Sequence, residues 1–288
     1  MARIAVDGLE LDYELIGPEG GTPLVLTPGG RYPRDTAGVP ELGQIFADNG
    51  YRVLLWDRPG CGASDITFTA PTESVMNAQA LVGIVRELGL KDIVLVGGSA
   101  GSRISLMAAA RMPGNVRKIA AWWFSGGPIG LAGLAWFYCG DQVAAASKGG
   151  MEAVAALPSW AEQTAKNPRI RDILLAQDAD TYIDTMQTWA KAFNYRDDTP
   201  MPGMTEADWA SLTMPVQLFR SGKSDMAHTR RTSEWVHELL PNSTMFEPPW
   251  GDQEWNFVST FPVDPVNRRG RFERWPLIAP MVLEFLRD

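Results

Sequence analysis

The sequence is poor in the residues that build metal sites and disulfide frameworks. Its 288 residues include two cysteines, Cys61 and Cys139, and two histidines, His228 and His237. Two cysteines do not make a disulfide framework, and no metal-ligand cluster or nucleotide-binding fingerprint accompanies them. We therefore expect no bound metal and no cofactor. Because histidine is so scarce, any imidazole chemistry depends on one of two residues.

Long hydrophobic runs and an excess of basic charge are also missing. The longest apolar stretches, Ile119–Phe124 and Leu131–Tyr138, fall well short of the roughly 20 residues that span a bilayer. The opening residues, Met1–Asp7, contain no apolar signal core. Lys and Arg number 26 against 34 Asp and Glu, a net charge of −8 that argues against binding to nucleic acid or to an anionic membrane. These absences predict a cytoplasmic protein with a small-molecule substrate, and they leave the oligomeric state open, a homo-oligomer included.

Short buried strands alternating with amphipathic helices dominate what is present. Alternating residues on both sides of Asp7-Gly8 predict an opening hairpin. Further strands are predicted at Pro23–Thr27, Arg52–Trp56, Ile93–Val96, Val116–Trp123, Val216–Ser221 and Ser243–Glu247, and helices at Glu73–Leu88, Ala100–Arg111, Thr232–Leu240 and Leu277–Leu286. This alternation predicts an α/β fold, a mostly parallel sheet of about eight strands with helices on both faces.

One long segment interrupts the alternation. Residues 130–205 contain no convincing strand and are predicted to form a helical cap inserted into a core made of residues 1–129 and 206–288. A connection of that length commonly serves as a lid. Its aromatic side chains, among them Trp136, Phe137 and Trp189, predict a pocket for an apolar or aromatic acyl group, the alternative being ordinary core packing.

The most informative stretch is Ile93–Gly101. A buried strand runs into Gly-x-Ser-x-Gly centred on Ser99, and an amphipathic helix follows at once. In this context the pattern predicts a nucleophile elbow, a sharp turn that strains the serine and holds its hydroxyl above the sheet. The helix N-terminus there favours negative charge, so the amide of Ala100 is predicted to stabilise an oxyanion. The alternative is a glycine-rich turn whose serine only caps the helix.

Two further turns follow other predicted strands. Leu24–Arg31 ends in Pro-Gly-Gly, so the backbone amide of Gly30 or Arg31 is the candidate for a second oxyanion donor. The Arg31 side chain is interpreted either as a partner for a substrate carboxylate or as a surface residue. The turn in Trp56–Asp65, where Asp57 and Arg58 can pair, is interpreted as a structural element beside the oxyanion loop.

Together the three turns resemble those of the α/β-hydrolase family with a helical cap. They occur in that family's order and at similar intervals, and the Gly-Gly-Ser-x-Gly-Ser run resembles the proline iminopeptidase branch. The resemblance implies that Ser99 is the nucleophile and that Asp225, after the next-to-last strand, is the triad acid. It also implies a histidine beyond the last strand, but Asp252 occupies that position.

The missing histidine leaves two candidates for the base. His237 lies beside apolar residues of a predicted helix and is interpreted as a surface or packing residue. His228 lies in the loop that carries Asp225 and predicts a rearranged triad, in which His228 is the general base for Ser99. The orienting carboxylate is Asp225 or Asp252. We prefer Asp252, since a carboxylate three residues away in a tight loop can point in the wrong direction.

This triad predicts a serine hydrolase, in which an acyl group is transferred to Ser99 and then hydrolysed by water, with a small carboxylic ester as substrate. One alternative is a proline iminopeptidase-like aminopeptidase, which needs cap carboxylates to bind a free amine. The available ones are Glu152, Glu162, Asp178 and Asp180. Another alternative, suggested by the missing histidine, is a catalytically impaired ligand-binding or sensing protein. Fold alone does not choose between ester, amide, lactone and carbon–carbon bonds.

Overall fold

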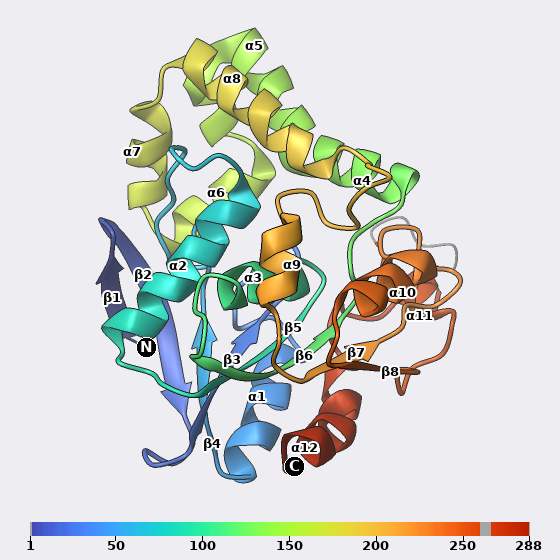
Figure 1. The fold of residues 1–288 in the computed structure, drawn as a ribbon. Helices are drawn as coiled ribbons and strands as arrows, with labels where there is room; N and C mark the ends of the chain where they lie inside the picture. The colour runs from blue at the N-terminus through green and yellow to red at the C-terminus, as the bar shows by residue number, and fades with distance from the viewer. Residues whose placement is uncertain (1, 260–265, 288) are drawn as a thin grey trace.

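An eight-stranded sheet forms the centre of the protein (Figure 1), in the order β1-β2-β4-β3-β5-β6-β7-β8. The structure is a computed structural model that describes residues 2–259 and 266–287. Its strands are β1 Ala2–Val6, β2 Leu9–Ile16, β3 Thr22–Thr27, β4 Tyr51–Trp56, β5 Ile93–Gly98, β6 Val116–Trp122, β7 Val216–Phe219 and β8 Ser243–Phe246. β2 pairs antiparallel with β1 and β4, and the other neighbours are parallel. The predicted α/β fold with a mostly parallel sheet is confirmed.

The β1–β2 hairpin turns on two residues with positive φ. Asp7 has φ 47° and Gly8 has φ 86°, the left-handed pair that a two-residue hairpin turn needs. Glycine adopts this conformation without a steric cost, and aspartate is one of the few other residues that tolerate it. The turn places Val6 opposite Leu9, as the alternation in the sequence predicts.

Helices cover both faces of the sheet. Side chains along β3 alternate between two buried clusters, since Val25 packs with α2 and α3 while Leu24 and Leu26 pack with α1 and α12. The helices of this part are α1 Val39–Asp48, α2 Glu73–Glu87, α3 Ala100–Ala109, α9 Glu206–Ser211, α10 Arg230–Leu239, α11 Glu254–Val258 and α12 Ala279–Arg287. Helix α1 is absent from the sequence-based predictions, although apolar Val39, Leu42 and Phe46 follow a helical spacing.

The long connection between β6 and β7 is helical. We call its residues 128–193 the helical segment, which lies above the sheet in Figure 1. It contains α4 Pro128–Ala135, a π-helical turn Trp136–Gly140, α5 Asp141–Ala155, α6 Pro158–Lys166, α7 Arg169–Leu175, α8 Ala179–Ala190 and a 3₁₀ turn Lys191–Phe193. It has its own apolar cluster, in which Trp160, Tyr182 and Trp189 are buried. Its division from the rest of the chain as a separate cap stays a prediction.

A buried carboxylate links the helical segment to the loop after β4. Asp65 Oδ1 accepts a hydrogen bond of 2.9 Å from Asn167 Nδ2, and Arg169 Nη2 lies 3.0 Å from its Oδ2. Asn167 is 1% exposed, whereas the Arg169 side chain is 54% exposed. Since water screens the charge of the exposed Arg169 side chain, the buried amide is the stronger of the two links.

We expect Asn167→Ala to destabilise the protein by about 1–3 kcal/mol, because it leaves a buried carboxylate oxygen without its partner. Arg169→Ala is the matched control on the same carboxylate, and we expect it to cost less than about 1 kcal/mol. Urea unfolding of both variants provides the measurement. Equal losses in the free energy of unfolding would show that Asn167 and Arg169 contribute equally to stability.

Candidate active site

Ser99 lies at the junction of β5 and α3 with strained backbone geometry. Its φ is 58° and its ψ is −120°, a conformation that L-residues rarely adopt. The neighbouring glycines make this turn possible. A Cβ on Gly97 would lie 2.8 Å from the backbone of Gly101, and a Cβ on Gly101 would lie 2.1 Å from the Thr27 carbonyl oxygen. The predicted sharp strand-to-helix turn is therefore present, with the serine as its strained residue.

His228 lies against Ser99. Its Nε2 is 2.8 Å from Ser99 Oγ, although 129 residues separate the two. His228 is 2% exposed, in the loop between β7 and α10. The Trp123 ring stacks on the imidazole at a centroid distance of 5.7 Å, and the Trp255 ring meets it edge-on at 4.8 Å. These rings restrict the imidazole to an orientation that points Nε2 at the hydroxyl.

Asp225 is the carboxylate at the other nitrogen of this imidazole. His228 Nδ1 lies 3.1 Å from Oδ1 and 3.0 Å from Oδ2 of Asp225. The same Oδ1 accepts hydrogen bonds from the backbone amides of Ala227, at 3.0 Å, and His228, at 2.8 Å. The carboxylate thus caps its own loop, and this turn directs it at the ring. A separation of three residues therefore favours the contact.

The preference for Asp252 as the orienting carboxylate is wrong. Asp252 Oδ1 accepts a 2.7 Å hydrogen bond from Arg230 Nη2, and its side chain is 40% exposed. Its backbone carbonyl accepts a 2.6 Å hydrogen bond from Ser224 Oγ, so the two loops touch through Asp252 without bringing its carboxylate to the imidazole. The remaining histidine, His237, lies on α10 with Nδ1 2.7 Å from Ser243 Oγ, as a packing residue does.

The loop after β3 lies beside Ser99. A Cβ on Gly29 would lie 3.0 Å from Ser99 Cβ, and Gly30 lines the same cavity as Ser99. Buried Arg58 donates from Nη2 to the carbonyls of Gly29, at 3.2 Å, and Gly30. In a trans peptide the amide points opposite to the carbonyl. Holding these carbonyls therefore orients the amides of Gly30 and Arg31 away from Arg58.

The predicted Asp57–Arg58 pair does not form. Asp57 accepts hydrogen bonds from the backbone amides of Arg34, at 2.8 Å, and Ala63, at 3.0 Å. Because the Asp57 carboxylate is buried, these bonds offset the cost of removing it from water. Arg58 therefore binds the loop after β3 instead, a contact that no motif in the sequence predicts.

The Arg31 side chain does not reach the Ser99 cavity. Its Nε and Nη2 donate to Glu73 at 2.8 and 3.1 Å, and Nη2 also donates to the Tyr138 carbonyl at 3.1 Å. The surface interpretation is wrong, since the side chain is largely buried. Its Nε and Nη2 are bound by the first turn of α2 and by the helical segment, away from the cavity where a substrate carboxylate was expected. Ala100, as the first residue of α3, has an amide without an intrahelical acceptor.

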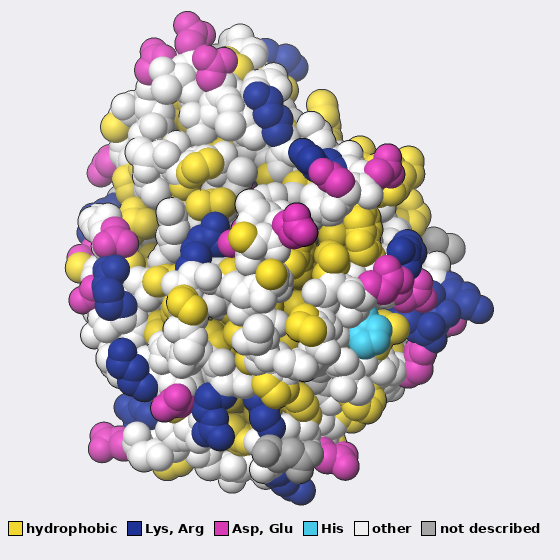
Figure 2. Space-filling model, in the orientation of Figure 1, with side chains coloured by type: hydrophobic (Ala, Val, Ile, Leu, Met, Phe, Trp, Pro, Cys, Tyr) yellow, Lys and Arg dark blue, Asp and Glu magenta, His cyan; other side chains and the backbone are white. Residues whose placement is uncertain are grey.

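A mostly apolar cavity of about 280 Å³ opens on Ser99. Its walls include Tyr32, Ser99, Trp123, Ile129, Leu134, Phe137, Tyr138, His228, Trp255, Arg271 and Phe272. Figure 2 shows hydrophobic side chains gathered between α4 and α10, the region above this cavity. Of the predicted pocket residues only Phe137 lines it. Trp136 is 65% exposed, and Trp189 is buried in the helical segment, where its indole donates to the Ala70 carbonyl.

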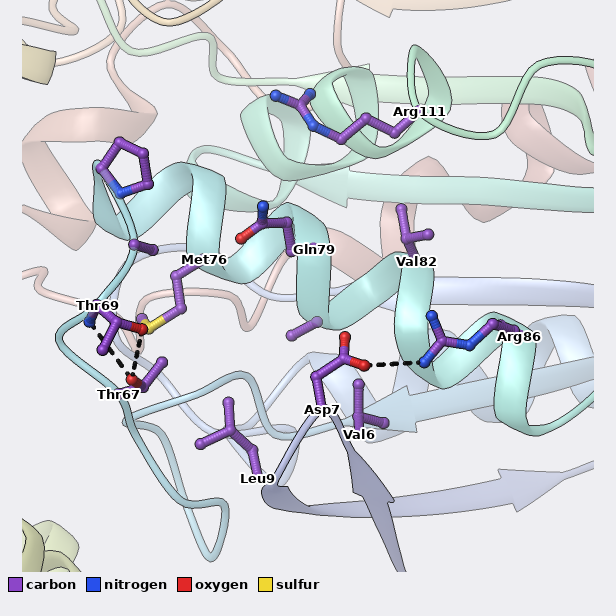
Figure 3. A pocket seen from close by; sticks show the side chains of 13 residues that line it. Val6, Asp7, Leu9, Thr67, Thr69, Met76, Gln79, Val82, Arg86 and Arg111 are labelled. Carbon is purple, nitrogen blue, oxygen red and sulfur yellow. Dashed lines mark hydrogen bonds and ion pairs between the residues drawn. The ribbon is translucent and has the colours of Figure 1, made fainter.

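A larger cavity of about 480 Å³ lies elsewhere, between β1, α2 and the loop 67–71 (Figure 3). It contains an exposed ion pair of 3.1 Å between Asp7 and Arg86, with Met76 and Arg111 in its wall. Neither Ser99 nor His228 lines it, so cavity size does not identify the reactive site here.

The two cysteine thiols are buried and unpaired. Burial raises the pKa of Cys61 to about 11 and that of Cys139 to about 12. At neutral pH both are therefore protonated and poor nucleophiles. In the part of the chain that the structure describes, no group of His, Cys, Asp or Glu is placed to hold a metal ion. Among these residues, no helix has the length and apolar character needed to cross a bilayer.

We expect the folded protein to react with dithiobis(nitrobenzoic acid) at pH 8 at least about 100-fold more slowly than the denatured chain, because a raised thiol pKa removes thiolate. The rate should increase with pH as the pH approaches 11. Spectrophotometric thiol titration, with and without guanidinium, measures both rates. A thiol that reacts in the folded protein as fast as in the denatured chain would contradict the burial described here.

Comparisons with known proteins agree with this architecture. Residues 23–122 match the alpha/beta hydrolase fold family. The serine hydrolase BPHL of Mus musculus is 32% identical over 124 residues, 42% of each chain. A 2-hydroxy-6-oxononadienedioate/2-hydroxy-6-oxononatrienedioate hydrolase of Paraburkholderia phymatum is 39% identical over 74 residues, 26% of each chain. The matches thus cover about two fifths or less of these relatives' length.

Solved structures resemble the whole chain at lower identity. The enol-lactonase of Burkholderia xenovorans LB400 is 17% identical with a TM-score of 0.61, over 100% of both chains. A thermophilic esterase of Thermogutta terrifontis is 17% identical with a TM-score of 0.60, over 100% of this chain and 98% of that one. The family match ends before Asp225 and His228, so it carries no information about them. The kinship with the proline iminopeptidase branch stays a prediction. The chain has the alpha/beta hydrolase fold, and residues 23–122 match the family of that name.

Proposed function

We propose that this protein is a serine hydrolase that acts on a small carboxylic ester, or a related acyl substrate, through an acyl-Ser99 intermediate. One observation carries the proposal. An unbroken hydrogen-bond chain runs from Ser99 Oγ to His228 Nε2, at 2.8 Å, and from His228 Nδ1 to Asp225 Oδ2, at 3.0 Å. A nucleophile, a base and an orienting carboxylate in this order define a triad by geometry, whatever their order in the sequence.

The geometry supports a two-step reaction. The neutral imidazole of His228 donates from Nδ1 to Asp225, which leaves Nε2 as the acceptor of the Ser99 proton while Oγ attacks the acyl carbon. The negative charge on the tetrahedral intermediate lies near the amide of Ala100 and that of Gly30 or Arg31. His228 then gives its proton to the departing alcohol. Water, deprotonated by the same Nε2, attacks the acyl-enzyme and releases the acid and free Ser99.

The cavity supports a small, largely apolar substrate. Its volume of about 280 Å³ lies at the lower end of the range for small-molecule sites, and most of its wall is aromatic or aliphatic. Known proteins that resemble the chain include an enol-lactonase and an esterase, which supports an oxygen ester over an amide.

The two alternatives have less support. None of Glu152, Glu162, Asp178 and Asp180 is among the described residues that line the Ser99 cavity, and all four are exposed, so a free amine would have no carboxylate partner there. The case for an impaired, ligand-binding protein came from the missing histidine. His228 at 2.8 Å from Ser99 removes that reason.

We expect His228→Gln to lower kcat/KM for p-nitrophenyl butyrate by about 10²–10⁴-fold, because the exchange removes the base that accepts the Ser99 proton. His237→Gln changes the other histidine in the same way and should stay within a few-fold of the parent. Spectrophotometric release of p-nitrophenol gives both values, and a fluorophosphonate probe should label Ser99 in the parent. Comparable activity in the two variants would remove His228 from the mechanism.

We expect Asp225→Asn to lower kcat by about 10³–10⁴-fold, because an amide cannot stabilise the imidazolium and favours the wrong tautomer. Asp252→Asn is the matched exchange in the neighbouring loop and should cost no more than a few-fold. The same ester assay compares them. If Asp252→Asn causes the larger loss, Asp225 is not the orienting carboxylate.

A further inference from the structure

A second, smaller chamber of about 30 Å³ adjoins the Ser99 cavity. The two share Gly30, Leu134 and Tyr138 as walls, and Ala100 of the elbow lines the smaller one. About half of the smaller chamber's wall is polar, whereas the main cavity is mostly apolar. Its further walls include Arg58, Glu73, Asn77 and Arg103. Any substrate bound at Ser99 therefore lies next to this polar space.

Arg103 enters the chamber from the first turns of α3. It follows Ser99 by four residues, and its amide donates to the Ser99 carbonyl at 3.3 Å, so it lies one helical turn from the nucleophile on the same face. The residue is 4% exposed. Its Nη1 makes one hydrogen bond, 3.3 Å long, to the Ala192 carbonyl, and its guanidinium lies 5.5 Å from the centre of the Phe193 ring.

This buried guanidinium lacks a counter-charge. Its Nη2 has no hydrogen-bond partner, and among residues 2–259 and 266–287 no carboxylate lies within ion-pair distance of it. Burial lowers the pKa of Arg103 to about 10, so the group still carries its charge at neutral pH. An unpaired buried charge is costly, and buried charges are normally paired. The one hydrogen bond to the Ala192 carbonyl does not offset the cost of burying the Arg103 charge.

Other groups in the chamber point to the same kind of ligand. Among the described residues, Arg58 Nε also lacks a hydrogen-bond partner. Asn77 Oδ1 is unpartnered too, but as an acceptor it does not favour an anion. Glu73 is the carboxylate among the described wall residues, and both its oxygens are bound by Arg31, at 2.8 and 3.1 Å. The chamber wall therefore contains two guanidinium groups with unused donors, and one carboxylate whose charge Arg31 already neutralises. The field in the chamber favours an anion.

We propose that Arg103 binds a free carboxylate of the substrate while the scissile bond lies at Ser99. This inference rests on the proposed function and narrows its substrate to acyl compounds that carry a second, ionised carboxyl group. The apolar middle of such a molecule fits the main cavity, and the chamber has room for one small polar group. A guanidinium matches a carboxylate because its planar fork can donate two parallel hydrogen bonds.

The test compares esters that differ only in the terminal group. Monomethyl esters of butanedioic, pentanedioic and hexanedioic acids are compared with methyl esters of butanoic, pentanoic and hexanoic acids, and pH-stat titration gives kcat and KM. We expect the parent to prefer at least one acid ester by 10-fold or more in kcat/KM, chiefly through KM. A parent without this preference overturns the proposal. A seventh substrate, 4-acetoxybutanoate, shows whether a carboxylate on the alcohol side is accepted instead.

Variants then assign the preference to Arg103. In Arg103→Met the ratio of acid-ester to neutral-ester kcat/KM should fall to about one, and Arg103→Lys, which keeps the charge but not the fork, should restore part of it. Arg271→Met changes another cation in the cavity wall. A ratio that persists in Arg103→Met, with both series falling equally, identifies a structural role and overturns the proposal. Loss of the ratio in Arg271→Met alone also overturns it.

A binding measurement separates this inference from the proposed function. In Ser99→Ala, which cannot form an acyl-enzyme, 10 mM glutarate should raise Tm, and glutaramide at about the same concentration should not. The shift should vanish when Arg103→Met is added. If glutarate stabilises the protein but no ester is hydrolysed and no fluorophosphonate adduct forms, the proposed function fails and the carboxylate site remains. If esters are hydrolysed but glutarate produces no shift, the carboxylate site fails alone.

Discussion

The site depends on the close approach of two backbones at the elbow. Gly101 packs against the Thr27 carbonyl so tightly that a Cβ would lie 2.1 Å from it, and this contact holds α3 against the end of β3. The packing keeps Ser99 at a positive φ that an isolated turn would relax. The hydroxyl, the first amide of α3 and the loop after β3 consequently meet at one edge of the sheet. The strained conformation of Ser99 persists because β3 and β5, which flank the elbow, are packed in the buried core.

The loop after β7 supplies two groups that the family resemblance assigned to two loops. Asp225 accepts from the backbone amides of Ala227 and His228, and this small turn holds carboxylate and imidazole in contact. The loop after β8 is then free of a direct role at Ser99, and Asp252 pairs with Arg230 instead. A local turn thus replaces a contact between two loops. The imidazole is kept in place by Trp123 and Trp255, which come from distant parts of the chain.

Charge is distributed unevenly around Ser99. The main cavity is mostly aromatic and aliphatic, whereas the chamber beneath Tyr138 holds Arg58 and Arg103. Arg58 binds the carbonyls of the loop after β3, and Arg31 and Glu73 neutralise each other. Among the described residues neither Arg58 nor Arg103 has a carboxylate partner, but Arg58 binds two carbonyls whereas Arg103 binds one. The reaction proposed at Ser99 thus takes place in the apolar cavity, and the substrate selectivity proposed for Arg103 depends on the neighbouring chamber.

The strands, most helices of the core and the elbow could be predicted from the sequence. These features depend on residues close in the chain: hydrophobic periodicity, the Asp7-Gly8 turn and the glycines around Ser99. It also selected His228, because two histidines left little choice. Three features became apparent from the fold: Asp225 contacts His228 where Asp252 does not, Trp189 lies inside the helical segment, and Arg31 pairs with Glu73. The physical reason is that side-chain direction depends on what packs around each loop, and residues far apart in the chain make those contacts.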